Sequence, residues 1–213
     1  MGKHFWAGLT ALGLILATVS MADAQTAVFG FNDHNGSPSS GTYSPGDSFT
    51  FSITLAFTPG GNVANLEGLS YWFEQANNPG GPFIFSITNR DLSASVFNDP
   101  QTLHVVYPQV LSPQSASDLG AIDDAGPVGA GGYFIADVTI QISAGAAPGI
   151  YQIENTTTGG KTSAITDSAG HTAPIPQAIY TVTIVPEPSS IALFATGLPM
   201  AVGFVRRLRA RAR

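Results

Sequence analysis

The chain has 213 residues, which is enough for one substantial domain, and its hydrophobic content of 44% excludes an intrinsically disordered protein. Its formal net charge is −6, but the segment from Gln25 to Val185 has two basic residues, Arg90 and Lys161, against twelve acidic ones, a net charge of −10. Phosphate backbones repel such an acidic domain, so nucleic acid is excluded as a partner, and the absence of cysteine excludes disulfides.

The first residues have the organisation of a secretory signal. Lys3 precedes an apolar run over residues 5–19, and Ala22-Asp23-Ala24 then presents small side chains to signal peptidase. We therefore expect residues 1–24 to be a signal peptide and Gln25 to be the first mature residue. The alternative is an uncleaved membrane anchor, but the apolar run is short for a membrane span.

Alternation of apolar and polar residues with a period of two predicts β-strands in the middle of the chain. It is clearest over residues 48–57 and 134–143. The side chains expected to point inward there are Phe49, Phe51, Ile53, Leu55, Phe57, Phe134, Ala136, Val138, Ile140 and Ile142. Weaker strands are expected over residues 27–31, 66–74, 83–89, 102–107, 150–154, 161–166 and 178–185.

The composition between these strands favours turns rather than helices. The chain has 24 glycines, 15 prolines and only 10% charged residues, and turn clusters such as Pro59-Gly60-Gly61 and Ala147-Pro148-Gly149 separate the predicted strands. No amphipathic helix of ordinary length is expected. Strands with one apolar face imply two antiparallel sheets packed face to face, so residues 25–185 are predicted to form a single antiparallel β-sandwich of eight or nine strands.

The order of motifs in this region resembles cohesin-type and related carbohydrate-binding-module sandwiches. Tyr43-Ser44-Pro45-Gly46-Asp47 leads into the strand at 48–57, and Ala147-Pro148-Gly149-Ile150-Tyr151-Gln152-Ile153 follows the strand at 134–143. Asp167-Ser168-Ala169-Gly170 then precedes the last strand. The resemblance implies a cohesin-like or immunoglobulin-like jelly roll. No motif matches the dockerin-binding surface of the family, so no binding residue is carried over.

Three loop segments carry oxygen donors of the kind that calcium prefers, namely Asn32-Asp33-His34-Asn35, Asp123-Asp124 and Asp167. None has the spacing of an EF-hand, and Asp or Asn in a turn usually hydrogen-bonds its own backbone. We therefore expect no cofactor, with calcium as the open alternative.

Trp72 is the candidate platform for stacking a sugar ring. Tyr71 and Phe73 share one face of the predicted strand, and Trp72 points to the other. If Leu69, Tyr71 and Phe73 face the core, Trp72 points outward and is available for a glycan. The alternative is that both faces are covered, or that Trp72 closes the edge of a sheet.

No catalytic motif is visible in the chain. There is no G-x-S-x-G, no H-E-x-x-H and no cysteine, and His34, His104 and His171 stand alone. His104 lies in a predicted strand, where a structural role is expected. We expect a protein without enzymatic activity. A secreted hydrolase is the alternative, because a fold can bring a distant acid and base together.

Residues 186–213 have the features of a marginal membrane anchor. The prolines of Pro186-Glu187-Pro188 cannot continue a strand or helix, so this segment should be extended and accessible. Residues 189–205 form an apolar helix of about 25 Å, shorter than a hydrocarbon core of about 30 Å. Five arginines should keep the C-terminus on the cytoplasmic side: Arg206, Arg207, Arg209, Arg211 and Arg213.

The order of Pro186-Glu187-Pro188, a short apolar helix with Gly197-Leu198, and Arg206-Arg207 closely resembles the PEP-CTERM sorting domain. In that family the tail is the recognition signal of a membrane protease, exosortase, and the hosts are Gram-negative bacteria that make exopolysaccharide. The resemblance implies a precursor in the cytoplasmic membrane that is then released to the cell surface or to the extracellular matrix of a biofilm. A permanent single-span protein is the alternative.

Two functions of the domain remain open. One is a non-catalytic surface or matrix module that binds other proteins or builds extracellular material. The other is a module that binds exopolysaccharide through Trp72.

Overall fold

The computed structural model describes residues 26–33, 39–76, 81–99, 105, 107–112, 118–157 and 161–186. These ranges contain strands and turns but no helix, which confirms the expectation of an all-β fold. It follows that no helix in the described part is long and apolar enough to cross a membrane. The predicted signal peptide and the predicted apolar tail helix lie outside these ranges.

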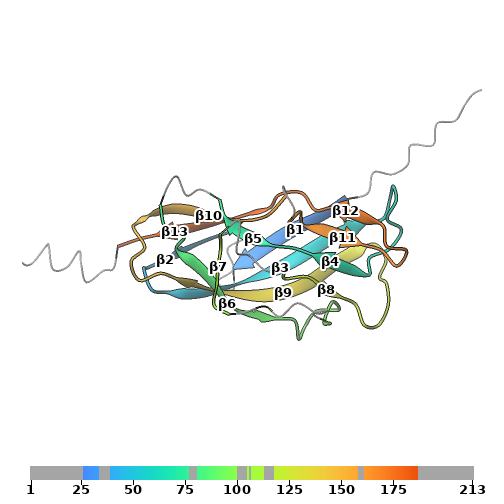
Figure 1. The fold of residues 1–213 in the computed structure, drawn as a ribbon, viewed down its shortest axis with the longest axis horizontal. Coiled ribbons are helices and arrows are strands. Elements are labelled where there is room, and N and C mark those ends of the chain that lie inside the picture. The colour runs from blue at the N-terminus through green and yellow to red at the C-terminus, as the bar shows by residue number, and fades with distance from the viewer. Residues whose placement is uncertain are drawn as a thin grey trace, which may run out of the picture.

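One layer of the molecule is a continuous five-stranded antiparallel sheet (Figure 1). In spatial order its strands are β1 (Thr26–Asp33), β3 (Ser48–Thr58), β9 (Gly131–Ile142), β6 (Phe85–Asp91) and β7 (Gln109–Val110). The alternation predicted for residues 48–57 is confirmed, because the side chains of Phe51, Ile53 and Leu55 are fully buried.

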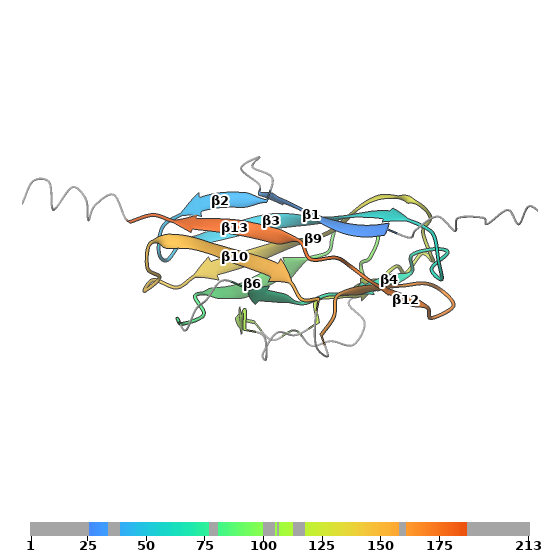
Figure 2. The ribbon, with the colours of Figure 1, turned by 90° about the horizontal axis from the view of Figure 1, so that it is seen from above.

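The rest of the sandwich is divided into two four-stranded sheets. The first consists of β2 (Ser40–Tyr43), β13 (Ile179–Ile184), β10 (Gly149–Asn155) and β5 (Phe73–Gln75). The second consists of β12 (Thr172–Pro174), β11 (Ala164–Thr166), β4 (Gly68–Ser70) and β8 (Ala121–Ile122). The first lies toward the left and the second toward the right of the elongated molecule in Figure 1, and β10 and β12 show the same separation in Figure 2. Only Tyr71 and Trp72 separate β4 from β5 along the chain, so the two sheets follow one another in the same layer.

Most predicted strands coincide with an observed strand, but the observed arrangement differs from the predicted one in three ways. The strand expected over residues 66–74 is two strands in different sheets, so three sheets replace the expected two. The short strands β2, β7, β8 and β12 were not expected, and the strand predicted over residues 102–107 falls mostly outside the described residues. Among the described strands, the pairing of β13 with β2 is parallel and all others are antiparallel.

A bulge in β9 corrects the prediction for Phe134. Ile53 of β3 pairs with Ala136, whereas the next residue, Thr54, pairs with Phe134, so Ile135 is the extra residue. Ile135 is fully buried and Phe134 is half-buried on the side of Thr54. The prediction that Phe134 points inward is wrong, because a bulge inverts the alternation of side chains beyond it.

Aromatic rings join the continuous sheet to the divided layer. The ring centroid of Phe51 lies 5.5 Å from that of Phe31, 5.7 Å from that of Phe73 and 5.0 Å from that of Tyr180. Phe31 and Phe51 belong to β1 and β3, whereas Phe73 and Tyr180 belong to β5 and β13. Such ring pairs add to the free energy of area burial, so this cluster holds the two layers together.

Candidate functional site

Trp72 lies where β4 ends and β5 begins, at the division of the layer. Its neighbours Tyr71 and Phe73 are fully buried, whereas Trp72 is half-buried. Its carbonyl oxygen accepts a hydrogen bond from the backbone N–H of Thr156 at 3.0 Å. The use of Trp72 as a sugar platform stays a prediction.

Two glutamates stand opposite one another beside Trp72. Glu74 of β5 and Glu154 of β10 are direct partners across the antiparallel pair, and both are half-buried. No ion pair joins either of them to another described residue. Burial raises the pKa of Glu154, and the carboxylate of Glu74 raises it further. Like charges that face each other across strands are destabilising, so this pair costs stability unless a positive group comes between them.

A buried asparagine fixes the segment that borders this pair. Asn155 is fully buried, its Nδ2 donates to the carbonyl oxygen of Pro176 at 3.3 Å, and its Oδ1 accepts the backbone N–H of Ala178 at 2.7 Å. These two bonds hold Gln177 above β10, where its Nε2 donates to Oε2 of Glu154. The amide of Gln177 therefore partly offsets the effect of burial on the pKa of Glu154.

Exposed aliphatic side chains flank the glutamates. Ile179 is the partner of Glu154 in β13 and is 38% exposed, and Ile150, on the same side of β10, is 64% exposed. We call the surface formed by Glu74, Ile150, Glu154, Gln177 and Ile179, with Trp72 at its border, the acidic face. It combines a concentrated negative charge with apolar contacts.

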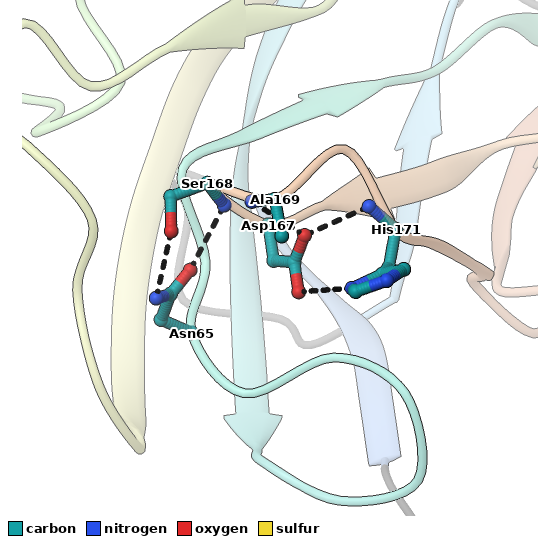
Figure 3. A network of polar contacts seen from close by, with 5 residues as sticks. All are labelled: Asn65, Asp167, Ser168, Ala169 and His171. Carbon is teal, nitrogen blue, oxygen red and sulfur yellow. Dashed lines mark hydrogen bonds and ion pairs between the residues drawn. The ribbon is translucent and has the colours of Figure 1, made fainter.

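Asp167 occupies the turn between β11 and β12, and Figure 3 shows its contacts. Its Oδ1 accepts the backbone N–H groups of Ala169 at 2.9 Å and of His171 at 2.8 Å, and its Oδ2 lies 3.0 Å from Nδ1 of His171. Gly170 adopts a φ of 83°, which an L side chain rarely adopts, and closes the turn. Asn65 hydrogen-bonds Ser168 through both ends of its amide. Asp167 thus serves its own turn rather than an open cation site.

In the other two candidate calcium loops, the acids differ in their surroundings. Oδ1 of Asp123 accepts the backbone N–H of Ala125 at 2.7 Å, and the neighbouring Asp124 is exposed to solvent. Asp33 is 6% exposed and accepts the hydroxyl of Tyr43 at 3.2 Å. Across the residues that the structure describes, no three His, Asp or Glu side chains gather in a way that would hold a metal ion.

Most of the predicted processing residues, two of the isolated histidines and one residue of a candidate calcium loop lie outside the described residues. They are Ala22, Ala24, His34, Asn35, His104, Glu187, Pro188, Gly197, Arg206 and Arg207. Pro186 is described and exposed. The last sandwich hydrogen bond before it runs from the backbone N–H of Val185 to the carbonyl oxygen of Tyr43 at 2.9 Å. The described sandwich therefore ends directly before the proline.

Sequence reasoning did not find the Glu74–Glu154 pair. Each residue was recognisable as a polar position in an alternating strand. Only the register of β5 against β10 brings them together, and residues 74 and 154 are far apart in the chain.

Comparison with known proteins bears on the fold. No protein-family model matches the chain, and no curated protein matches it in sequence. Among solved structures, the chain is similar to CaCohA2 from Clostridium acetobutylicum, with a TM-score of 0.50 and 12% identity over 76% of this chain and 92% of that one. A chain from the complex of CaCohA2 with a variant of CaDoc0917 gives a TM-score of 0.51 and 11% identity over 75% of this chain and 100% of that one. Both of these structures contain a cohesin module. The described domain is a cohesin-like β-sandwich.

Proposed function

We propose that the protein is an exported cell-surface or extracellular-matrix protein whose sandwich binds another protein and has no catalytic activity. The observation that carries the proposal is the Glu74–Glu154 pair, two facing carboxylates with no cation partner among the described residues. A lysine or arginine of a partner placed between them would relieve their repulsion. Ile150, Ile179 and Trp72 would supply the apolar part of such an interface.

The fold likeness supports a binding role rather than a catalytic one. CaCohA2, which has a similar fold, is found in complex with a variant of CaDoc0917. The one histidine–carboxylate pair among the described residues, His171 with Asp167, stabilises a turn rather than activating a nucleophile.

The proposed route to the surface rests on the two ends of the chain. The signal-peptide pattern of residues 1–24 and the PEP-CTERM-like tail from Pro186 provide export and sorting by signal peptidase and an exosortase-type protease. The chain enters β1 at one end of the elongated sandwich and leaves β13 at the other (Figure 1). A precursor held by its tail would thus present the end that carries β11 and β12 away from the membrane.

Binding is tested with the exported protein immobilised and exposed to the envelope proteins of its host. We expect the double variant Glu74→Gln, Glu154→Gln to lose the proteins that the wild type retains. Retention by the wild type should also weaken as the salt concentration rises. The matched control is Asp124→Asn, which removes an exposed acid outside the acidic face. Equal retention by the double variant and the control, measured by quantitative mass spectrometry, would remove the acidic face from the proposal.

Sorting is tested by replacing Pro186, Glu187 and Pro188 with alanine. The triple variant should lose the recognition feature and let the helix continue outward, so the precursor should accumulate in the cytoplasmic membrane. Neutralising the five arginines after Val205 should instead weaken the orientation of the segment. Fractionation and the mass of the released domain distinguish the outcomes. Equal release from the wild type and the triple variant would mean that the tail is an ordinary anchor.

A further inference from the structure

β1 is the outermost strand of the continuous sheet. It pairs with β3 on one side, and no described strand lies on its other side in the order of the sheet. The other edge strands of the three sheets are shorter: β7 and β8 have two residues, β5 and β12 have three, and β2 has four. Short strands and prolines such as Pro174 of β12 protect a sheet edge against pairing with another chain. β1 has eight residues and no proline, so it lacks both protections.

One hydrogen bond shows which residues of β1 direct their backbone groups toward the free edge. The backbone N–H of Ser39, which is not part of β3, donates to the carbonyl oxygen of Phe31 at 2.9 Å. Because the backbone groups of successive residues in a strand point alternately to its two sides, Ala27 and Phe29 also point away from β3. No described backbone group outside β3 hydrogen-bonds Ala27 or Phe29. The N–H and C=O groups of both residues are therefore open to another strand.

The open part of the edge is neutral, although the segment from residue 25 to residue 185 has a net charge of −10. No charged side chain occurs over residues 26–32 of β1 or over residues 48–58 of β3. Val28 is 50% exposed on the outer side of the sheet, and its partner in β3, Ala56, is exposed as well. A basic partner would find no charge to bind at this edge, whereas a second, equally acidic copy would not be repelled from it.

The open groups of β1 are also complementary to themselves. If two copies pair antiparallel about a two-fold axis at Val28, Ala27 of each copy lies opposite Phe29 of the other. Both residues direct their backbone groups across the edge, so each of these pairs exchanges both of its hydrogen bonds. The pairing ends before Phe31, whose carbonyl oxygen already accepts from Ser39. Val28 then faces Val28 of the second copy in a non-hydrogen-bonded pair, where side chains are closest.

We propose that the exported protein forms a dimer in which the β1 strands of two copies pair antiparallel and join their five-stranded sheets into one. The backbone groups of Ala27 and Phe29 supply the hydrogen bonds, and the two Val28 side chains supply an apolar contact. With the cleavage after Ala24 proposed above, only Gln25 precedes β1 in the exported protein. The dimer goes beyond the proposed function, because the edge of β1 shares no residue with the acidic face.

Sedimentation velocity over a series of concentrations of the exported protein measures the association. We expect a concentration-dependent dimer for the wild type. Val28→Lys should weaken dimerisation about tenfold, because it places like charges opposite one another at the two-fold axis. Ala27→Pro should weaken it as well, because it removes an N–H that β1 does not use in its pairing with β3. The matched control is Val110→Lys in β7, which changes a valine that is 43% exposed in the strand at the opposite edge of the sheet and should dimerise like the wild type.

A single introduced thiol reports the register of the pairing, because the chain contains no cysteine. Opposite residues of a non-hydrogen-bonded antiparallel pair have Cα atoms about 4.5 Å apart, within the disulfide range of about 4.4–6.8 Å. Val28→Cys should therefore give a disulfide-linked dimer under mild oxidation with copper phenanthroline. Ala56→Cys, which lies one strand further from the axis, should stay unlinked and is the control.

Circular dichroism and thermal unfolding establish that each variant is folded. The proposal is overturned if the folded wild type sediments as a monomer at every concentration, or if Val28→Lys and Val110→Lys dimerise equally. It is equally overturned if Val28→Cys gives no more linked dimer than Ala56→Cys. A disulfide from Val28→Cys to another envelope protein of the host, rather than to a second copy, would assign the edge to that protein and overturn the proposal too.

Discussion

The two layers of the sandwich differ in the length of their strands and in the kind of side chain that they bury. The continuous sheet is built around β3 and β9, of 11 and 12 residues, whereas β4, β5, β11 and β12 of the divided layer have three residues each. The inward side of β3 is a row of fully buried apolar side chains. The divided layer instead buries polar side chains near its break, among them Asn155, Thr156 and Ser163.

Because of this difference, we expect the continuous sheet to determine the stability of the domain and the broken layer to determine its binding. In the continuous sheet, the backbone groups find partners in neighbouring strands, and the side chains are free to form an apolar core. Where the other layer breaks, side chains such as Asn155 must satisfy backbone groups, because a buried unpaired polar group is costly. The acidic face lies along this break. We therefore expect substitutions in the continuous sheet to change stability most, and substitutions beside the break to change binding.

The largest effect is expected for Phe51→Ala in β3. Phe51 is fully buried and its ring contacts those of Phe31, Phe73 and Tyr180, so truncation should lower the free energy of unfolding by about 3–5 kcal/mol. Denaturant unfolding measures this loss, with Thr54→Ala on the outer side of the same strand as the control. A loss below about 1 kcal/mol would mean that the continuous sheet does not carry the core.

A smaller loss is expected for Asn155→Ala beside the break. The substitution leaves the carbonyl group of Pro176 and the N–H of Ala178 without their buried partner, which should cost about 2 kcal/mol. Gln177→Ala removes an exposed side chain of the same segment and is the control. If Asn155→Ala unfolds at the same denaturant concentration as the control, the hydrogen bonds of Asn155 to the backbone of Pro176 and Ala178 do not stabilise the domain.

A pH-dependent effect is expected for Asp167→Asn in the turn between β11 and β12. Burial by itself raises the pKa of Asp167, but hydrogen bonds from His171 and Ala169 outweigh it and hold the pKa below the ordinary value of 3.8. The stabilisation by the ionised carboxylate is therefore complete above the unfolded-state pKa and is lost as the pH falls through the folded-state pKa.

Urea unfolding between about pH 6 and about pH 3 checks this expectation. The wild type should lose more stability than Asp167→Asn over this interval, so that the two curves converge in acid. Parallel curves would show that the carboxylate makes no difference between the folded and unfolded states.

The smallest effect, of opposite sign, is expected for Glu154→Gln in the acidic face. Burial and Glu74 raise the pKa of Glu154, so the ionised form costs stability at neutral pH, and this cost disappears as the pH falls through the raised pKa. The variant should gain about 0.5 kcal/mol or less at neutral pH and low salt, because solvent screens the partly exposed pair. A loss of stability in thermal unfolding at low salt would show that the pair is not repulsive.

The sequence predicted best the strands in which buried and exposed residues alternate without interruption along the chain. Residues 48–57 alternate without interruption, and a side-chain period of two is a property of the chain itself. The same reasoning gave the wrong side for Phe134 in β9, because the bulge at Ile135 can be recognised only from the pairing with the partner strand. The break between β4 and β5 at Tyr71 and Trp72 was not predicted for a similar reason. An apolar run does not reveal which sheet each of its halves joins.

The sequence alone was sufficient for an all-β sandwich, because alternation and turn residues act over a few neighbours. It also supports the prediction of an exported protein with a sorting tail, through motifs that are contiguous. Tertiary structure was needed to bring Glu74 opposite Glu154 and to divide one layer between β4 and β5. Each of these depends on the register or the end of a strand relative to a distant one, which the energetics of the whole sandwich set.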